Sequence, residues 1–256
     1  MCSNFQALRE IERMERYFRI HGVIPEFPRE TWPGYLAPYI RRDHDNAEYA
    51  RQLRAGQFGL IPHWAKDTKI GRQTYNSRTE TSATKPAFRD AWRRGHRAVI
   101  PAAWIYEPNY EAGKPVRWKI QHVDGEPMGI DGLWSWWRAP DGQEVESFTM
   151  LTVNADDHPL MKRFHRPEDE KRMVVLDPAD YDRWLDCPQG EMMSMMLAGV
   201  GSRNEKVGCS IHLSGTNLNS QKSPVRKTGL FCFRRSNGGY RGNCGGPRNL
   251  ICGCGS

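Results

Sequence analysis

The 256-residue chain lacks the features of a membrane-spanning or exported protein. No stretch approaches the roughly 20 apolar residues that cross a bilayer, and no charged segment followed by an apolar one opens the chain, as in a secretory signal. Cysteine is scarce before residue 200, where only Cys2 and Cys187 occur. We therefore expect no membrane association, a cytoplasmic location and no disulfide framework.

The first 199 residues also lack an excess of positive charge. Residues 200–256 hold nine Lys or Arg and one acid, a charge of +8, which leaves −1 for residues 1–199 of a chain whose net charge is +7. The overall basic balance is thus no argument for nucleic-acid binding. Any affinity of the first 199 residues for a polyanion must come from local clusters.

Composition changes sharply near residue 199. Residues 200–256 contain 11 of the 24 glycines and five of the seven cysteines, with no sustained periodicity. This predicts a folded domain over residues 1–199 and a flexible, basic, Gly/Cys-rich tail over residues 200–256. The spacing Cys232-x11-Cys244-x7-Cys252-x-Cys254 lacks the paired C-x2-C typical of zinc modules and gives little support to a metal site.

Hydrophobic periodicity and turn residues predict a strand-rich domain with inserted helices. A proline- and aromatic-rich ordered loop is expected over residues 23–40. Helices are predicted over residues 3–21, 82–94, 156–164 and about 177–186, and strands over residues 48–61, 97–106, 116–123, 128–137, 146–153 and 172–176. Because strands and helices do not alternate regularly, we expect an α+β fold with a curved, mostly antiparallel, barrel-like sheet.

The first residue with distinctive chemistry is Cys2. Removal of Met1 would leave an α-amine and a thiol on one residue, and such a 1,2-aminothiol reacts with an aldehyde. The amine forms a Schiff base and the thiol closes a five-membered thiazolidine ring. Both groups have pKa values of about 8 to 8.5, so modest shifts keep them usable near neutral pH. From position alone, an ordinary cysteine near the start of the chain is the more frequent case.

Three further groups could support acid–base or positioning chemistry. Asn76 and Arg78 belong to a polar run between a strand and a helix, where helix capping is the alternative. Glu107 ends an apolar strand, and burial would raise its pKa and suit it to proton transfer. His165 lies in a loop before a strand and could shuttle protons. A Glu paired with an Arg and a solvated His are the structural alternatives.

The order of the blocks is more informative than any one of them. It runs Met1-Cys2-x-x-Phe5, Phe58-Gly59-Leu60-Ile61-Pro62-x-Trp64, Asn76-x-Arg78-x-Glu80-Thr81, Ile100-Pro101-Ala102-x-x-x-Tyr106-Glu107, Leu151-Thr152 and His165. In this order the chain resembles the SRAP family of abasic-site processing proteins. The resemblance covers about residues 1–185.

The resemblance implies an SRAP-like catalytic domain and a mechanism without metal or cofactor. Cys2 would form a thiazolidine crosslink with the aldehyde of an abasic site in single-stranded DNA. Asn76 would hold the Cys2 terminus or the sugar, Glu107 would be the acid–base group, and His165 would help proton transfer. The resemblance further implies a side lyase activity, autocatalytic Met1 removal of the peptidase type and a role in DNA damage repair and the SOS response. It also implies a monomer of bacterial or phage-like origin, associated with the nucleoid when bound to DNA.

DNA contacts require local cations and aromatic rings. Arg93 and Arg94 could equally complement the dipole at a helix C-terminus. The residues predicted to contact DNA are Arg78, Trp64, Lys66, Arg93, Arg94, Arg97 and Arg166.

The chain departs from the family pattern at three places. Ser3-Asn4 stands where Gly-Arg is common, which removes one phosphate-binding arginine, and Pro108 stands where Trp commonly follows Glu107. Five residues, 167–171, intervene between the His165 segment and Arg172-Met173. The position of His165 therefore depends on how this insertion folds.

Two other functions compete with the abasic-site hypothesis. An N-terminal cysteine nucleophile amidohydrolase would share Cys2, with its own α-amine as base, but requires an oxyanion hole and predicts amide hydrolysis. In a passive single-strand-binding protein, replacement of Cys2 would change nothing. A covalent adduct that depends on Cys2 separates the three.

Overall fold

The computed structural model describes residues 2–43, 48, 50–174, 181–192 and 194, and the backbone of residues 207–211. These residues belong to one compact unit, Met1–Ser214, and the second unit, Gly215–Ser256, lies outside the described residues. The described backbone thus includes a short segment beyond the predicted boundary at residue 199. Whether residues 215–256 form a flexible tail stays a prediction.

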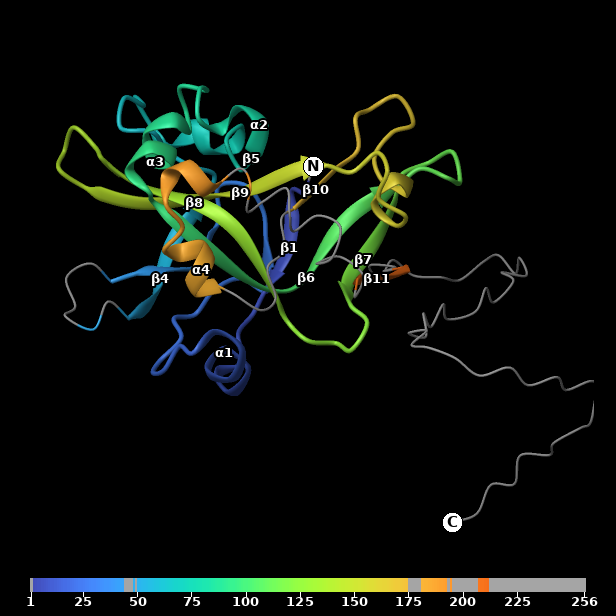
Figure 1. The fold of residues 1–256 in the computed structure, drawn as a ribbon, viewed down its shortest axis with the longest axis horizontal. Helices are drawn as coiled ribbons and strands as arrows, with labels where there is room; N and C mark the ends of the chain where they lie inside the picture. Colours follow the sequence, from blue (N-terminus) through green and yellow to red (C-terminus); the bar gives the residue numbers. More distant parts are fainter. Residues whose placement is uncertain are drawn as a thin grey trace, which may run out of the picture. The chain divides into compact units, whose positions relative to one another are not determined.

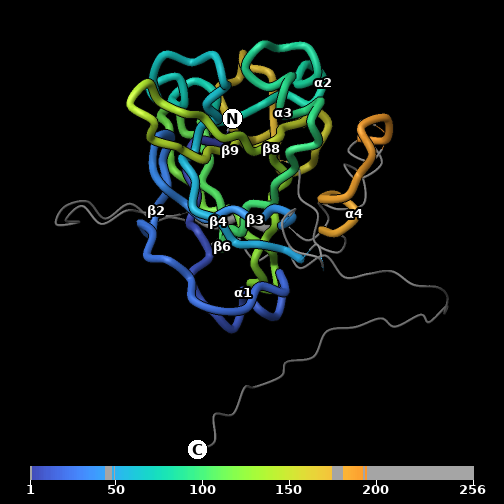
Figure 2. Tube along the Cα trace, turned by 90° about the vertical axis from the view of Figure 1, so that its left-hand side faces the viewer, coloured from blue at the N-terminus to red at the C-terminus, as the bar shows by residue number. Residues whose placement is uncertain are grey.

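Five strands close into a barrel: β3 (Leu36–Arg42), β4 (Arg51–Phe58), β6 (Arg97–Asn109), β8 (Met128–Arg138) and β9 (Glu144–Asn154). Four of the five contacts around this ring are antiparallel, and β4 pairs with β9 in parallel. In Figure 2, β8 and β9 lie across the ring from β3 and β4. This arrangement confirms the predicted α+β class with a curved, mostly antiparallel, barrel-like sheet.

Shorter strands extend the sheet and carry the residues that matter below. β1 (Asn4–Ala7) lies between β6 and β2 (Glu30–Thr31), and β5 (Asn76–Arg78) runs parallel to β9. β7 (Val116–His122) pairs with β6 and with β11 (Val207–Ile211), and β10 (Arg172–Val174) pairs with β9.

Among the described residues, helices are few and short. They are α1 (Ile11–Phe18), α2 (Thr79–Ser82), α3 (Arg89–Arg94) and α4 (Tyr181–Leu185), with 3-10 turns η1 (Thr68–Arg72), η2 (Met161–Arg163) and η3 (Gln189–Glu191). In Figure 1, α1 lies at one end of the barrel and α2 and α3 lie toward the other. Within the described part of the chain, no helix is long and apolar enough to cross a membrane.

The barrel interior is packed with aromatic rings. Phe58 lies edge-on to Phe5 at 5.3 Å and stacks on Phe148 at 5.5 Å between ring centroids, and all three side chains are buried. Each buried side chain of this kind contributes about 1.5 to 3 kcal/mol relative to an exposed one. The interior is therefore a solid core, and chemistry is restricted to the ends and edges of the strands.

The predicted helix over residues 3–21 is wrong in its first part. Residues 4–7 form β1, where Phe5 enters the core opposite Ile105, and the helix begins only at Ile11. The helix-cap spacing of Ser3 and Gln6 is a local signal, and pairing with two neighbouring strands overrides it. This correction matters because β1 fixes the position of Cys2.

The predicted loop over residues 23–40 is also wrong in part, because it contains β2 and most of β3. Pro38 argued against a strand, since proline cannot donate to a ladder. The strand tolerates it because β3 pairs with β6 only at Ile40↔Val99, so β4 is the one ladder partner beside Pro38.

Other boundaries shift for local reasons. The predicted helix over residues 82–94 forms only in its second half, as α3, because α2 ends at Ser82 and turns around Pro86 follow. Only η2 forms within residues 156–164. The predicted strands over residues 97–106, 116–123, 128–137 and 146–153 are confirmed as β6 to β9. β10 and α4 lie within their predicted ranges, and the predicted Asp177-Pro178 helix cap lies outside the described residues.

Candidate active site

Cys2 is held at the end of a sheet strand. The register Asn4↔Tyr106 and Phe5↔Ile105 aligns the start of β1 with the end of β6, which carries Glu107. The Cys2 side chain is buried, and its Sγ donates to the carbonyl oxygen of Asn4 at 3.5 Å. Strand pairing thus fixes the residue that sequence analysis assigned to nucleophilic chemistry.

Asn76 connects a second part of the chain to Cys2. β5 runs alongside β9 with Asn76 opposite Met150, and the Asn76 side chain is buried. Its Nδ2 donates to the carbonyl oxygen of Cys2 at 2.7 Å. Asn76 therefore orients the Cys2 backbone, which is one of the two roles that the resemblance implied.

Glu107 is a carboxyl group in an apolar environment. It is 1% exposed, and both carboxylate oxygens are buried without a hydrogen-bond partner. Burial raises the pKa of Glu107 to about 7, although the positive amino terminus acts in the opposite direction. A carboxyl group with this pKa can both accept and return a proton at neutral pH.

The Cys2 thiol responds to the same environment. Burial, and then the negative charge of Glu107, raise its pKa well above the ordinary thiol value. The thiol is therefore protonated at rest, and its use as a nucleophile requires a base nearby. Glu107 is the group placed to take that proton.

His165 faces Glu107 from the loop before β10. Its Nδ1 lies 3.6 Å from Oε2 of Glu107, and its Nε2 lies 3.2 Å from the carbonyl oxygen of Arg172. Because a carbonyl only accepts, the ring hydrogen belongs on Nε2, and the lone pair of Nδ1 faces Glu107. Burial lowers the pKa of His165 to about 4, so the contact is a neutral imidazole beside a carboxyl group and not an ion pair.

The backbone at His165 is strained. Its φ of 63° lies in the left-handed region, which costs a residue other than glycine about 1 kcal/mol or more. The backbone N–H of His165 donates to the carbonyl oxygen of Pro108 at 2.9 Å, directly after Glu107. This bond holds the ring against Glu107 despite the insertion at residues 167–171.

Four predicted catalytic residues, Cys2, Asn76, Glu107 and His165, thus form one set, contributed by the residue before β1, by β5, by β6 and by the loop before β10. A hydrogen bond joins Asn76 to Cys2, the charge of Glu107 acts on the Cys2 thiol, and His165 lies against Glu107. The set combines a protonated thiol, a carboxyl group that titrates near neutral pH and a neutral imidazole. It suits nucleophilic and proton-transfer chemistry. Within the described part of the chain, no three His, Cys, Asp or Glu side chains are grouped as metal ligands.

Comparison with known proteins places the chain in a family. The family model described as SOS response associated peptidase (SRAP) matches residues 1–207. The chain belongs to the SRAP family.

Individual SRAP relatives align with a large part of the chain. The abasic site processing protein YoqW of Bacillus subtilis is 30% identical over 73% of this chain and 80% of its own length. The abasic site processing protein HMCES of Xenopus tropicalis is 28% identical over 62% of this chain and 52% of its own length. A crystal structure of a protein from Bordetella bronchiseptica is 35% identical, with a TM-score of 0.75, covering 83% of this chain and all of that chain.

The residues of this SRAP domain that are predicted to contact DNA differ in their exposure and in their partners. Arg78 follows Asn76 by two residues and pairs with Glu170 at 2.8 Å. Trp64 is 47% exposed, and its Nε1 donates to the carbonyl oxygen of Pro86 at 3.3 Å. Lys66, Arg93, Arg94 and Arg166 are exposed, with Arg93 in a weak pair with Asp90 at 3.4 Å.

Arg97 needs a correction. Its side chain is 5% exposed, and its guanidinium lies 5.7 Å from the ring centroid of Trp184. A buried side chain cannot contact a phosphate, so Arg97 stabilises the fold against α4. The sequence placed it beside Arg93 and Arg94, but β6 begins at Arg97 and carries its side chain into the protein.

Two residues beside the site, Tyr75 and Arg172, had no role predicted from the sequence. The Tyr75 hydroxyl has a raised pKa because of burial, Cys2 and Glu107, which places it in the same electrostatic environment. Arg172 is buried, and its carbonyl oxygen orients the His165 ring. No sequence signal marked either residue, because each acts through a neighbour from a distant segment.

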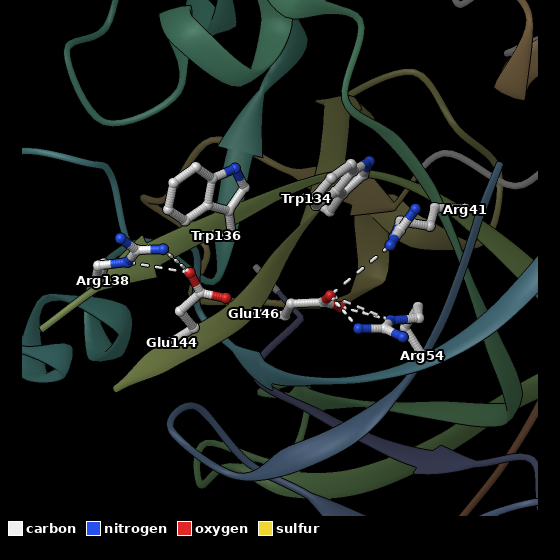
Figure 3. A pocket seen from close by; sticks show the side chains of 7 residues that line it. All are labelled: Arg41, Arg54, Trp134, Trp136, Arg138, Glu144 and Glu146. Carbon is white, nitrogen blue, oxygen red and sulfur yellow. Dashed lines mark hydrogen bonds and ion pairs between the residues drawn. The ribbon is translucent and has the colours of Figure 1, made fainter. Parts of the chain in front are cut away.

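A separate pocket of about 460 Å³ opens between strands of the barrel (Figure 3). Its carboxylates are matched by cations, with Glu146 hydrogen-bonded to Arg54 and Glu144 to Arg138. Glu146 precedes Met150, the partner of Asn76, by four residues, or about 13 Å of strand. None of the predicted site residues lines it; the lining residues are Arg41, Arg54, Trp134, Trp136, Arg138, Glu144 and Glu146.

Proposed function

We propose that this SRAP protein captures abasic sites in single-stranded DNA through a covalent bond to Cys2 after removal of Met1. The observation that carries the proposal is the contact set of Cys2, Asn76, Glu107 and His165. Relatives with the same family match are named abasic site processing proteins, which supports the choice of substrate.

The proposed reaction uses both groups of Cys2. The free amine attacks the aldehyde of the ring-opened abasic sugar, and loss of water gives a Schiff base. The Cys2 sulfur then adds to the carbon of the C=N bond, and the nitrogen is protonated, which closes the thiazolidine. The net change is loss of one water, so the crosslink needs neither oxidant nor reductant.

Protons move through Glu107 in this scheme. Its pKa of about 7 lets it accept the thiol proton and return one to the nitrogen or to the leaving water. The lone pair of His165 Nδ1 faces the Glu107 carboxyl group at 3.6 Å, which favours the protonated form of that group. Asn76 keeps the Cys2 backbone still, which limits the orientations of the amine.

Further activities belong to the same proposal. A Schiff base at the abasic sugar permits β-elimination, so a lyase side reaction accompanies crosslinking. Removal of Met1 by the same thiol would be the peptidase-type step. We further propose that the protein acts as a monomer on DNA in the cytoplasm.

The test is a denaturing gel and an intact mass spectrum after incubation with a single strand carrying one abasic site. We expect a heat-stable adduct, formed without reductant and lost with Cys2→Ala. If protein whose mass confirms loss of Met1 forms no adduct, the proposal fails. Amide hydrolysis by that same protein would then favour the N-terminal nucleophile amidohydrolase.

A further inference from the structure

The insertion at residues 167–171 places a carboxylate between two arginines. Oε1 of Glu170 accepts from Nη1 of Arg172 at 2.7 Å, and Oε2 lies 2.8 Å from Nη1 of Arg78. The hydrogen bond from Arg172 holds the pKa of Glu170 below its ordinary value, so this carboxylate is ionised at neutral pH. The insertion therefore supplies a permanent negative charge beside Arg78.

Arg172 does not depend on Glu170 alone. Its guanidinium also donates to Glu80 at 2.8 and 3.0 Å and to the carbonyl oxygen of Thr152 at 2.7 Å. With Glu170 neutralised, Arg172 keeps a bidentate partner of opposite charge. The contact of the Arg172 backbone carbonyl with the His165 ring is then retained.

Arg78 is in a different situation. Its side chain is 48% exposed, and within the described part of the chain its one ion pair is the contact with Glu170. It also lies two residues from Asn76, which binds the Cys2 backbone. Arg78 is thus a cation at the edge of the site, and a carboxylate of the same chain is already paired with it.

We propose that Glu170 is an acidic competitor for the DNA backbone at Arg78, which a phosphate must displace when a strand binds. This inference rests on the proposed function, because it takes nucleic acid as the substrate. One guanidinium edge cannot serve a carboxylate and a phosphate together, and the two anions repel each other.

The competitor has a consequence for selectivity. It weakens the reversible affinity for any single strand, damaged or not, whereas the bond to Cys2 retains only strands with an aldehyde. Undamaged strands are therefore released quickly. Glu170 thus shifts discrimination from reversible binding to covalent capture.

The test measures reversible binding with a probe that cannot react. A fluorescent single strand carrying a tetrahydrofuran abasic analogue has no aldehyde, so its Kd is an equilibrium value. The variants are Glu170→Gln, Arg78→Gln and the double change, measured over a salt series. Glu168→Gln removes the same charge from the same loop, and Glu80→Gln removes the other partner of Arg172 without touching Arg78.

We expect Glu170→Gln to tighten binding by about threefold to tenfold near 0.1 M salt, and to steepen the salt dependence by up to about 0.7, because Arg78 becomes an uncompensated cation at the DNA surface. Both changes should disappear in the Arg78→Gln background. Glu168→Gln and Glu80→Gln should each change Kd by less than about twofold, because Glu168 is an exposed charge in a loop and Glu80 binds Arg172 and not Arg78.

Any of three results overturns the inference. One is a Glu170→Gln gain no larger than that of Glu168→Gln, and another is an equal gain with Arg78 already replaced. Undetectable binding by every variant overturns it as well. If the expected pattern appears but aldehydic DNA forms no adduct, the covalent function fails while the competitor role stands. Unchanged melting temperatures establish that the variants are folded.

Discussion

The buried carboxyl group of Glu107 gives the protein an unusual pH dependence of stability. Its pKa rises from an ordinary 4.5 in the unfolded chain to about 7 in the folded protein. The folded state therefore binds this proton more tightly than the unfolded state. Replacement by Gln keeps the shape of the side chain and removes the titration.

The direction of the stability change with pH follows from how tightly the folded and unfolded states bind the Glu107 proton. As pH rises from about 4.5 to 7, the unfolded chain releases the proton while the folded protein retains it, so the free energy of unfolding falls. At about 1.4 kcal/mol per pH unit the whole loss is roughly 3.5 kcal/mol, and it is nearly complete by pH 8. Full burial of Glu107 justifies the conversion without a discount for screening. Relative to the original protein, Glu107→Gln should gain about 2 to 3 kcal/mol between pH 5 and pH 8.

The assay is urea unfolding of both proteins at pH 5 and pH 8. The difference between the two pH values cancels any pH-independent effect of the amide. Glu168→Gln, an exposed carboxylate in a loop, is the matched control and should show no such change. A stability difference between Glu107→Gln and the original protein that is the same at both pH values would refute the burial argument.

Three other predictions concern the site and its edge. The crosslinking rate of the original protein, divided by the rate of Glu107→Gln, should rise about tenfold from pH 6 to pH 8, because ionised Glu107 is the base. Titration of the Cys2 amine affects both proteins and cancels in this ratio. A flat ratio in rate measurements would exclude that role. Asn76→Ala leaves the Cys2 carbonyl unsatisfied and should cost about 1 to 3 kcal/mol in unfolding experiments and slow crosslinking; unchanged rates would contradict the orienting role. Arg97→Leu should lower the melting temperature without changing DNA affinity at equal folded fraction, whereas Arg94→Gln should weaken binding and leave the fold intact.

Sequence patterns predicted much of the barrel. The strands that became β6 to β9 are separated by turn residues, and β6, β8 and β9 are long and largely buried, so local signals and tertiary pairing agree. The prediction errors lie where local signals and tertiary pairing disagree. Residues 4–7 carry helix-cap signals yet form β1, and Pro38 argues against the strand in which it lies. In both cases the neighbouring strands supply backbone partners that no local pattern contains.

The candidate site divides in the same way. Cys2, Asn76, Glu107 and His165 could be proposed from sequence because their blocks occur in the order typical of the SRAP family, although each residue alone had a structural alternative. Arg97 was misplaced because exposure cannot be judged from a run of cations, and its side chain packs against Trp184. Glu170 was visible only as part of an insertion, because its contacts reach β5 and β10 from a loop.

The sequence by itself determined which chemical groups this SRAP domain has and in what order they occur, since covalent chemistry belongs to single residues. Only the tertiary structure decided the protonation, the tautomer and the pairing of these groups. Burial at the end of β6 raises the pKa of Glu107, the carbonyl of Arg172 selects the tautomer of His165, and Glu170 occupies Arg78. These properties depend on desolvation and on distances between segments far apart in the chain, and both exist only after the barrel has closed.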